Sequence, residues 1–189
     1  MTRILKPIAA QDVKYLHQIC AQYFMGERAF RIVEYNLGNT FTGSIDLLAS
    51  DDTSVYLITI NIADFAGALL RAFTGYRWFR ENREFLQRIY PPEVVDIGLP
   101  VQLIILSQDY PPEIPSIVDE VCSVPVGLYR YRLFGPAQDP DIFIEEIQSP
   151  GGILPAQDEE PDTLRKRLKI EAANLSDEDI REFQQAMRG

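Results

Sequence analysis

The sequence feature that most constrains the fold is a pair of apolar segments joined by a short polar turn. Residues 43–50 read GSIDLLAS, residues 54–62 read SVYLITINI, and the polar residues 51–53 lie between them. Two short apolar runs separated by turn-forming residues are typical of a β-hairpin. The sequence therefore predicts two antiparallel strands, and it places one acid, Asp46, inside the first of them.

Further helices and strands are expected on both sides of this hairpin. Apolar residues recur at helical spacing over 10–24 and again over 64–90, and the two prolines that follow end the second helix. The remaining expected elements are a strand at 29–38, a continuously apolar strand at 101–107, a short helix at 111–123 and a strand at 126–134.

This order predicts an α/β (α+β) fold, in which a mixed β-sheet is flanked by helices in the order αβββαβαβ. The first three strands have short links, which favour an antiparallel meander, whereas the later links are long enough for crossovers. We expect this domain to span 1–136. Residues 137–160 are rich in proline, glycine and acid and are expected to form a linker, with one short apolar strip at 142–147. Residues 161–189 are expected to form a C-terminal helical appendage.

The appendage allows two interpretations. Each of its expected helices carries an apolar stripe, and the second begins with a capping-box pattern at Ser176. The helices either pack on their own domain or pair two chains as a homodimer.

The charge of the chain limits the partners that it suits. The formal net charge is −10, which repels other polyanions at long range and disfavours nucleic acid as a partner, although a local basic groove is compatible with it. The lysines are confined to the two ends of the sequence, at Lys6, Lys14, Lys166 and Lys169. Chemistry in the central region therefore cannot use a lysine ammonium.

The cysteine, histidine and hydropathy patterns argue against several kinds of site. Cys20 and Cys122 are far apart in apolar surroundings, so we expect buried free thiols in a reducing compartment, the cytoplasm. His17, the single histidine, is expected to be a surface or packing residue, which gives little support to a nucleophile activated by a histidine base. The start of the sequence has no long apolar run, so we expect neither a signal peptide nor a membrane span.

Alternation along the two hairpin strands predicts which side chains share a face. Asp46 shares a face with Ser44 and Leu48, and Thr59 and Asn61 share the less apolar face of the second strand. Because the more apolar faces are expected in the core, we expect Asp46, Thr59 and Asn61 to lie together on the polar side of the hairpin.

These segments resemble the PD-(D/E)XK (restriction endonuclease-like) superfamily, in particular its RecB- and NucS-like endonucleases. The resemblance covers about residues 10–135 and rests on the element order, on GSIDLLA before the turn, on YLITIN after it and on YRWFREN in the long helix. In that family an aspartate ends the first motif strand, and an acid and a lysine lie two residues apart on the second. Asp46 matches the aspartate, but Thr59 stands at the acid position and Asn61 at the lysine position, so the motif is degenerate.

The resemblance implies hydrolysis of phosphodiesters with Mg²⁺ or Mn²⁺, and the degenerate motif implies that this activity is lost. Mg²⁺ prefers carboxylate ligands, and a cation at the lysine position stabilises developing charge. A threonine hydroxyl and an asparagine amide are neutral and replace neither group. We therefore expect a catalytically inactive nuclease-fold protein that needs no cofactor and acts through binding or assembly.

The alternative is a divalent-metal-dependent DNA or RNA endonuclease with a relocated active site. In that case Asp46 binds the metal. Glu34 or Asp64 supplies the second carboxylate, and Arg71 replaces the lysine.

Overall fold

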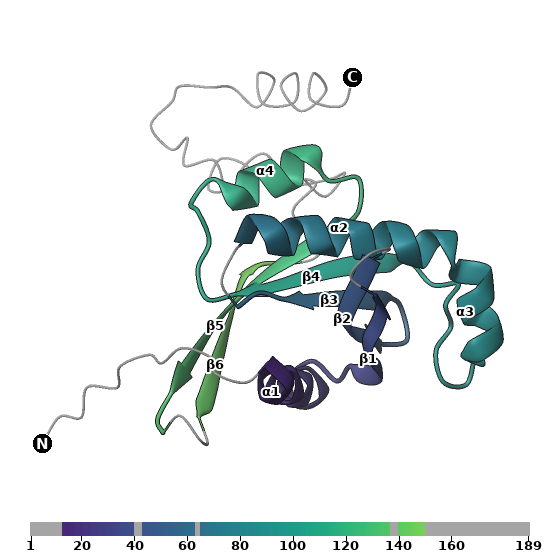
Figure 1. The fold of residues 1–189 in the computed structure, drawn as a ribbon, viewed down its shortest axis with the longest axis horizontal. Coiled ribbons are helices and arrows are strands. Elements are labelled where there is room, and N and C mark those ends of the chain that lie inside the picture. Colours follow the sequence, from purple (N-terminus) through teal and green to yellow (C-terminus); the bar gives the residue numbers. More distant parts are fainter. Residues whose placement is uncertain (1–12, 40–42, 63–64, 137–139, 150–189) are drawn as a thin grey trace, which may run out of the picture. The chain divides into compact units, whose positions relative to one another are not determined.

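The computed structural model describes residues 13–39, 43–62, 65–136 and 140–149 (Figure 1). The chain divides into two compact units, Met1–Gly152 and Ile153–Gly189. The second unit lies wholly outside the described residues, and so do the expected C-terminal helices.

Four helices and six strands are formed by the described residues. They follow one another as α1 (Val13–Glu27), β1 (Arg31–Asn39), β2 (Gly43–Ser50), β3 (Val55–Ile60), α2 (Phe65–Glu81), α3 (Arg83–Ile89), β4 (Val101–Ser107), α4 (Ile114–Val121), β5 (Val126–Phe134) and β6 (Asp141–Gln148). This confirms the expected mixed class, and it adds β6 to the expected order. No helix among these residues is both long and apolar enough to cross a bilayer.

The strands form one mixed sheet in the order β1-β2-β3-β4-β5-β6. The pairs β1–β2 and β2–β3 are antiparallel, as the short links predict. The pairs β3–β4 and β4–β5 are parallel, with helices in the connections between them. The final pair, β5–β6, is antiparallel again.

Helices cover both faces of the sheet and bury a separate apolar core on each. Helices α2 and α4 lie on one side and α1 lies on the other (Figure 1). Successive residues of β3 divide between these cores: Val55 and Leu57 pack on the α2 side, whereas Tyr56 and Ile58 pack on the α1 side. The hairpin is therefore buried on both faces, including the more polar face that carries Asp46 and Thr59.

The long helix expected at 64–90 is interrupted at Asn82, which separates α2 from α3. The side-chain amide of Asn82 donates a hydrogen bond to the carbonyl of Trp78, 2.8 Å away. Asparagine competes in this way for backbone groups that a continuous helix would use. The guanidinium of Arg83 then bonds the carbonyls of Ile97 and Leu99, which fixes α3 against the segment before β4.

The prediction of a linker at 137–160 is wrong for residues 141–148, because these residues form the edge strand β6. The apolar strip at 142–147 alternates between exposed and half-buried side chains, as an edge strand with one packed face does. Its pairing runs from Phe134↔Asp141 to Leu128↔Gln148, so antiparallel pairing with the preceding strand β5 decides its structure. Residues 150–160 lie outside the described residues.

Candidate functional site

Strands β2 and β3 part at one end of their hairpin, and Asp46 lies at this point. Their pairing runs from Ser50↔Val55 to Leu47↔Ile58, after which β2 continues beside β1 and β3 beside β4. We call the residues beyond the last β2–β3 pair the hairpin fork. They are Asp46 on β2 and Thr59, Ile60 and Asn61 at the end of β3.

Asp46 bridges the hairpin fork through its side chain. The backbone N–H of Ile60 donates to Oδ2 of Asp46 across 2.7 Å. The carboxylate thus replaces the carbonyl that a regular partner strand would present. Asp46 is only 7% exposed, so its charge is held in a largely dehydrated position.

Arg71 of α2 supplies a positive charge to this carboxylate. Its Nη1 lies 3.3 Å from Oδ1 and 3.4 Å from Oδ2 of Asp46. Its Nη2 donates to the backbone carbonyl of Ile60 across 2.9 Å. One guanidinium therefore bonds both strands of the hairpin fork, and the ion pair keeps one side toward solvent because the Arg71 side chain is 42% exposed.

A glycine one turn further along α2 permits this contact. A Cβ atom added to Gly75 would lie 2.7 Å from the carbonyl oxygen of Ser44 and 3.2 Å from Cγ1 of Ile45. Helix α2 therefore approaches β2 more closely than any larger residue allows. Since residues four apart share a helix face, the same approach brings Arg71 over Asp46.

Thr59 and Asn61 follow the last residue of β3 that pairs with β2, and both are buried, at 3% and 6% exposure. The Asn61 amide donates to the Ser107 hydroxyl across 2.9 Å, and the Tyr131 hydroxyl donates to the Asn61 backbone carbonyl across 2.7 Å. Asn61 thus ties the end of β3 to β4 and β5. It takes a structural position in the sheet, which the sequence analysis missed because Ser107 and Tyr131 are distant along the chain.

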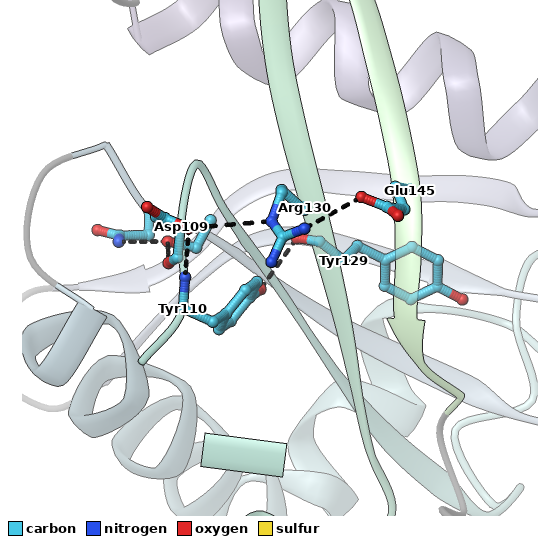
Figure 2. Close-up of polar contacts among 7 residues, drawn as sticks. Asp109, Tyr110, Tyr129, Arg130 and Glu145 are labelled. Carbon is cyan, nitrogen blue, oxygen red and sulfur yellow. Dashed lines mark hydrogen bonds and ion pairs between the residues drawn. The ribbon is translucent and has the colours of Figure 1, made fainter. Parts of the chain in front are cut away.

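A second polar cluster follows the C-terminal end of β4, and its residues contact one another (Figure 2). Arg130 lies between two acids, with Nη1 at 3.2 Å from Glu145 and Nε at 4.0 Å from Asp109. The Tyr110 hydroxyl lies 2.6 Å from the carbonyl of Ile105 and 2.9 Å from that of Tyr129. Burial raises the pKa of Tyr110 well above its usual range, so this phenol stays neutral and serves packing.

Helix α1 brings two further titratable groups within electrostatic range of the hairpin fork. Burial lowers the pKa of His17, the charge of Asp46 opposes this effect, and the charge of Arg71 adds to it. Burial and the charge of Asp46 together raise the pKa of the Cys20 thiol. His17 is buried, in agreement with a packing role, and both groups are uncharged at neutral pH.

The substitute residues named from the sequence have different outcomes. Arg71 is brought to Asp46. Glu34 instead accepts hydrogen bonds from the Tyr90 hydroxyl and from the backbone N–H of Tyr35. Asp64 lies outside the described residues.

The residues of the hairpin fork do not fit Mg²⁺ or Mn²⁺. Within the described ranges, no group of three or more histidine, cysteine, aspartate or glutamate side chains is arranged to hold a metal ion. Both oxygens of Asp46 already bond protein donors, and Arg71 places a fixed positive charge at the carboxylate. A divalent cation approaching Asp46 would be repelled by this charge and would find one carboxylate among the residues of the hairpin fork.

Comparison with known proteins adds no assignment to this geometry. No protein-family model matches the sequence, and no curated protein matches it either. The resemblance stated above therefore rests on the residues of this chain.

Proposed function

We propose that this protein has a nuclease-like fold, does not cleave nucleic acid, and acts through binding or assembly. The observation that carries the proposal is the state of Asp46, whose carboxylate is buried and bonded by Ile60 and Arg71. A carboxylate engaged in this way is poorly available as a ligand for a catalytic metal.

The neutral residues of the hairpin fork support the same conclusion. Metal-assisted hydrolysis of a phosphodiester needs an ion to polarise the phosphate and to activate water. Loss of one electrostatic stabiliser alone typically lowers kcat by about 10²–10³. Here Thr59 and Asn61 stand at the positions of the acid and the lysine, and both are buried.

Exposed apolar side chains on the described surface support a role in binding or assembly. Phe85 and Ile89 are exposed one turn apart on α3, and Phe143 is exposed on the edge strand β6. Large apolar groups on a surface often belong to interfaces with other proteins. Homodimer formation through the C-terminal helices remains part of this proposal, and nucleic acid is disfavoured by the net charge of −10.

The reduced state of the cysteines fits a cytoplasmic protein, which we also propose. Neither Cys20, which is buried, nor Cys122, which is half-buried and not buried as expected, forms a disulfide within the described residues. Free thiols are maintained in reducing compartments.

A cleavage assay tests the proposal directly. Pure protein is incubated with supercoiled plasmid and with single-stranded DNA or RNA, in Mg²⁺ and separately in Mn²⁺. We expect no cleavage by the unaltered chain. Cleavage that disappears in Asp46→Ala would refute the proposal, because it would trace hydrolysis to the hairpin fork.

The alternative, a metal-dependent endonuclease with a relocated site, is favoured by one observation. The guanidinium of Arg71 lies at Asp46, where the relocated lysine charge was expected. This alternative requires a divalent ion bound to Asp46 in the unaltered protein. Calorimetry that detects no binding of Mn²⁺ or Mg²⁺ to the unaltered chain would exclude it.

A further inference from the structure

We infer that the guanidinium of Arg71 takes the place of a divalent cation in the hairpin fork, so that removing it creates a cation site on Asp46 and Ile60. This inference goes beyond the proposed function: it assigns Arg71 the position of the metal, whereas the sequence had suggested the position of the lysine. It rests on the proposed lack of activity, since a protein that uses a metal at Asp46 could not also fill that position with arginine.

The first step is the convergence of two oxygen atoms on one cation. The Asp46 carboxylate comes from β2 and the Ile60 carbonyl from β3, yet both accept hydrogen bonds from the same guanidinium, at 3.3 Å and 2.9 Å. A carboxylate and a backbone carbonyl are hard oxygen donors of the kind that Mg²⁺, Mn²⁺ and Ca²⁺ bind. The pair is therefore a partial coordination sphere occupied by a side chain.

The second step is the need for a cation at this place. A buried carboxylate without an opposite charge is strongly unfavourable. The side chains of α1 that lie within electrostatic range, His17 and Cys20, are uncharged at neutral pH. No lysine occurs between residues 15 and 165. The charge of Arg71 thus meets a requirement that an ion would otherwise meet.

A cation from solvent could reach the position that the Arg71 guanidinium fills. The Arg71 side chain is 42% exposed, so the position it fills communicates with solvent. Shortening this side chain would leave Oδ1 of Asp46 and the Ile60 carbonyl facing a water-accessible space, while Oδ2 keeps its bond to the Ile60 N–H. With Asp46 as the one carboxylate of the hairpin fork, the resulting site is expected to bind Mn²⁺ with a Kd in the millimolar range, roughly 1 mM.

The experiment compares Mn²⁺ binding by the unaltered chain and by Arg71→Ala, using titration calorimetry and thermal unfolding. Arg71→Met is the second variant, because it keeps the apolar stem of the side chain and is better able to fold. Arg77→Ala is the matched control, since Arg77 is an exposed residue of the same helix that pairs with Glu81. Asp46→Asn combined with Arg71→Ala removes the proposed anionic ligand.

We expect Mn²⁺ at tenfold its Kd to raise the Tm of Arg71→Ala and Arg71→Met by about 3–6 °C. The unaltered chain, Arg77→Ala and the double variant should show no comparable rise. If the Arg71 variants are unfolded without metal, Mn²⁺ should restore their circular dichroism.

The inference is overturned if Mn²⁺ neither binds the folded Arg71 variants nor refolds the unfolded ones. It is also overturned if the double variant responds to Mn²⁺ as strongly as the single one. These readouts do not involve cleavage, so their failure is distinguishable from failure of the proposed function.

Discussion

Asp46, where strands β2 and β3 part, and Asp51, in the turn that joins these strands, belong to the same hairpin, and their carboxylates are bonded in opposite ways. Asp51, in the turn, accepts hydrogen bonds from the backbone N–H groups of Thr53 and Ser54 and from the hydroxyls of Thr53 and Tyr56, at 2.7–2.9 Å. All these donors lie within five residues. Asp46, at the open end, depends on Ile60 and on Arg71, which is 25 residues away.

The difference in burial between Asp46 and Asp51 explains why they need different hydrogen-bond and charge partners. Partial burial raises the pKa of Asp51, but the hydrogen bonds from Tyr56, Thr53 and Ser54 outweigh it and hold the pKa below its ordinary value of 3.8. Hydrogen bonds from neutral groups are thus sufficient to stabilise the carboxylate of a half-exposed aspartate. Asp46 is more deeply buried, and there the fold provides a full opposite charge.

The largest effect is expected when Asp46 is replaced by alanine. This change leaves Arg71 without its counter-charge and the buried N–H of Ile60 without an acceptor. The free energy of unfolding should fall by about 3 kcal/mol, as measured by urea denaturation. Asp46→Asn, which keeps an acceptor for Ile60, should lose less. Equal losses in the two variants would show that the hydrogen bond contributes nothing.

A second prediction concerns the close approach of α2 to β2. Gly75→Ala places a methyl group against the Ser44 carbonyl, so α2 has to move and carries Arg71 with it. We expect a loss of about 2 kcal/mol in the free energy of unfolding. Gly26→Ala is the matched control, because a Cβ there meets nothing within 4 Å and alanine favours the helix. A Gly75 variant as stable as the Gly26 variant would contradict the proposed approach.

The smallest effect is expected in the turn, where Asp51→Asn should lower the free energy of unfolding by about 1 kcal/mol at pH 7. Because the pKa of Asp51 is lower in the folded state, its contribution is present above about pH 4 and is lost as the pH falls through the folded value. The difference between Asp51→Asn and the unaltered chain should therefore shrink by pH 3 in urea unfolding curves. Asp52→Asn, at the exposed neighbouring residue, should show neither the loss nor the pH dependence.

Much of the fold follows from local sequence patterns. Strands β2, β4 and β5 begin and end at the residues expected from their apolar runs, and β3 differs by one or two residues at its ends. The errors fall where distant contacts decide the structure. Strand β6 forms because it pairs with the free edge of β5. The acidic and proline-rich residues around it favoured the prediction of a linker.

The candidate site was only partly predictable. Alternation predicted that Asp46, Thr59 and Asn61 share a face, because the side chains of a strand have a strict period of two. It could not show that α2 covers this face, since the rotation of a helix on a sheet depends on contacts such as that of Gly75 with Ser44. Arg71 was named as a substitute for the lysine, but its bond to the Ile60 carbonyl required the three-dimensional structure.

Asp46 and Arg71 are expected to be energetically coupled, because the guanidinium of Arg71 is paired with the buried Asp46 carboxylate. A double-mutant cycle of Asp46→Asn and Arg71→Met, read by urea unfolding, measures this coupling most directly. We predict that the double variant is more stable than the sum of the single losses implies, by about 1–2 kcal/mol. Losses that add within about 0.3 kcal/mol would contradict the claim, because they would show that Arg71 does not hold Asp46.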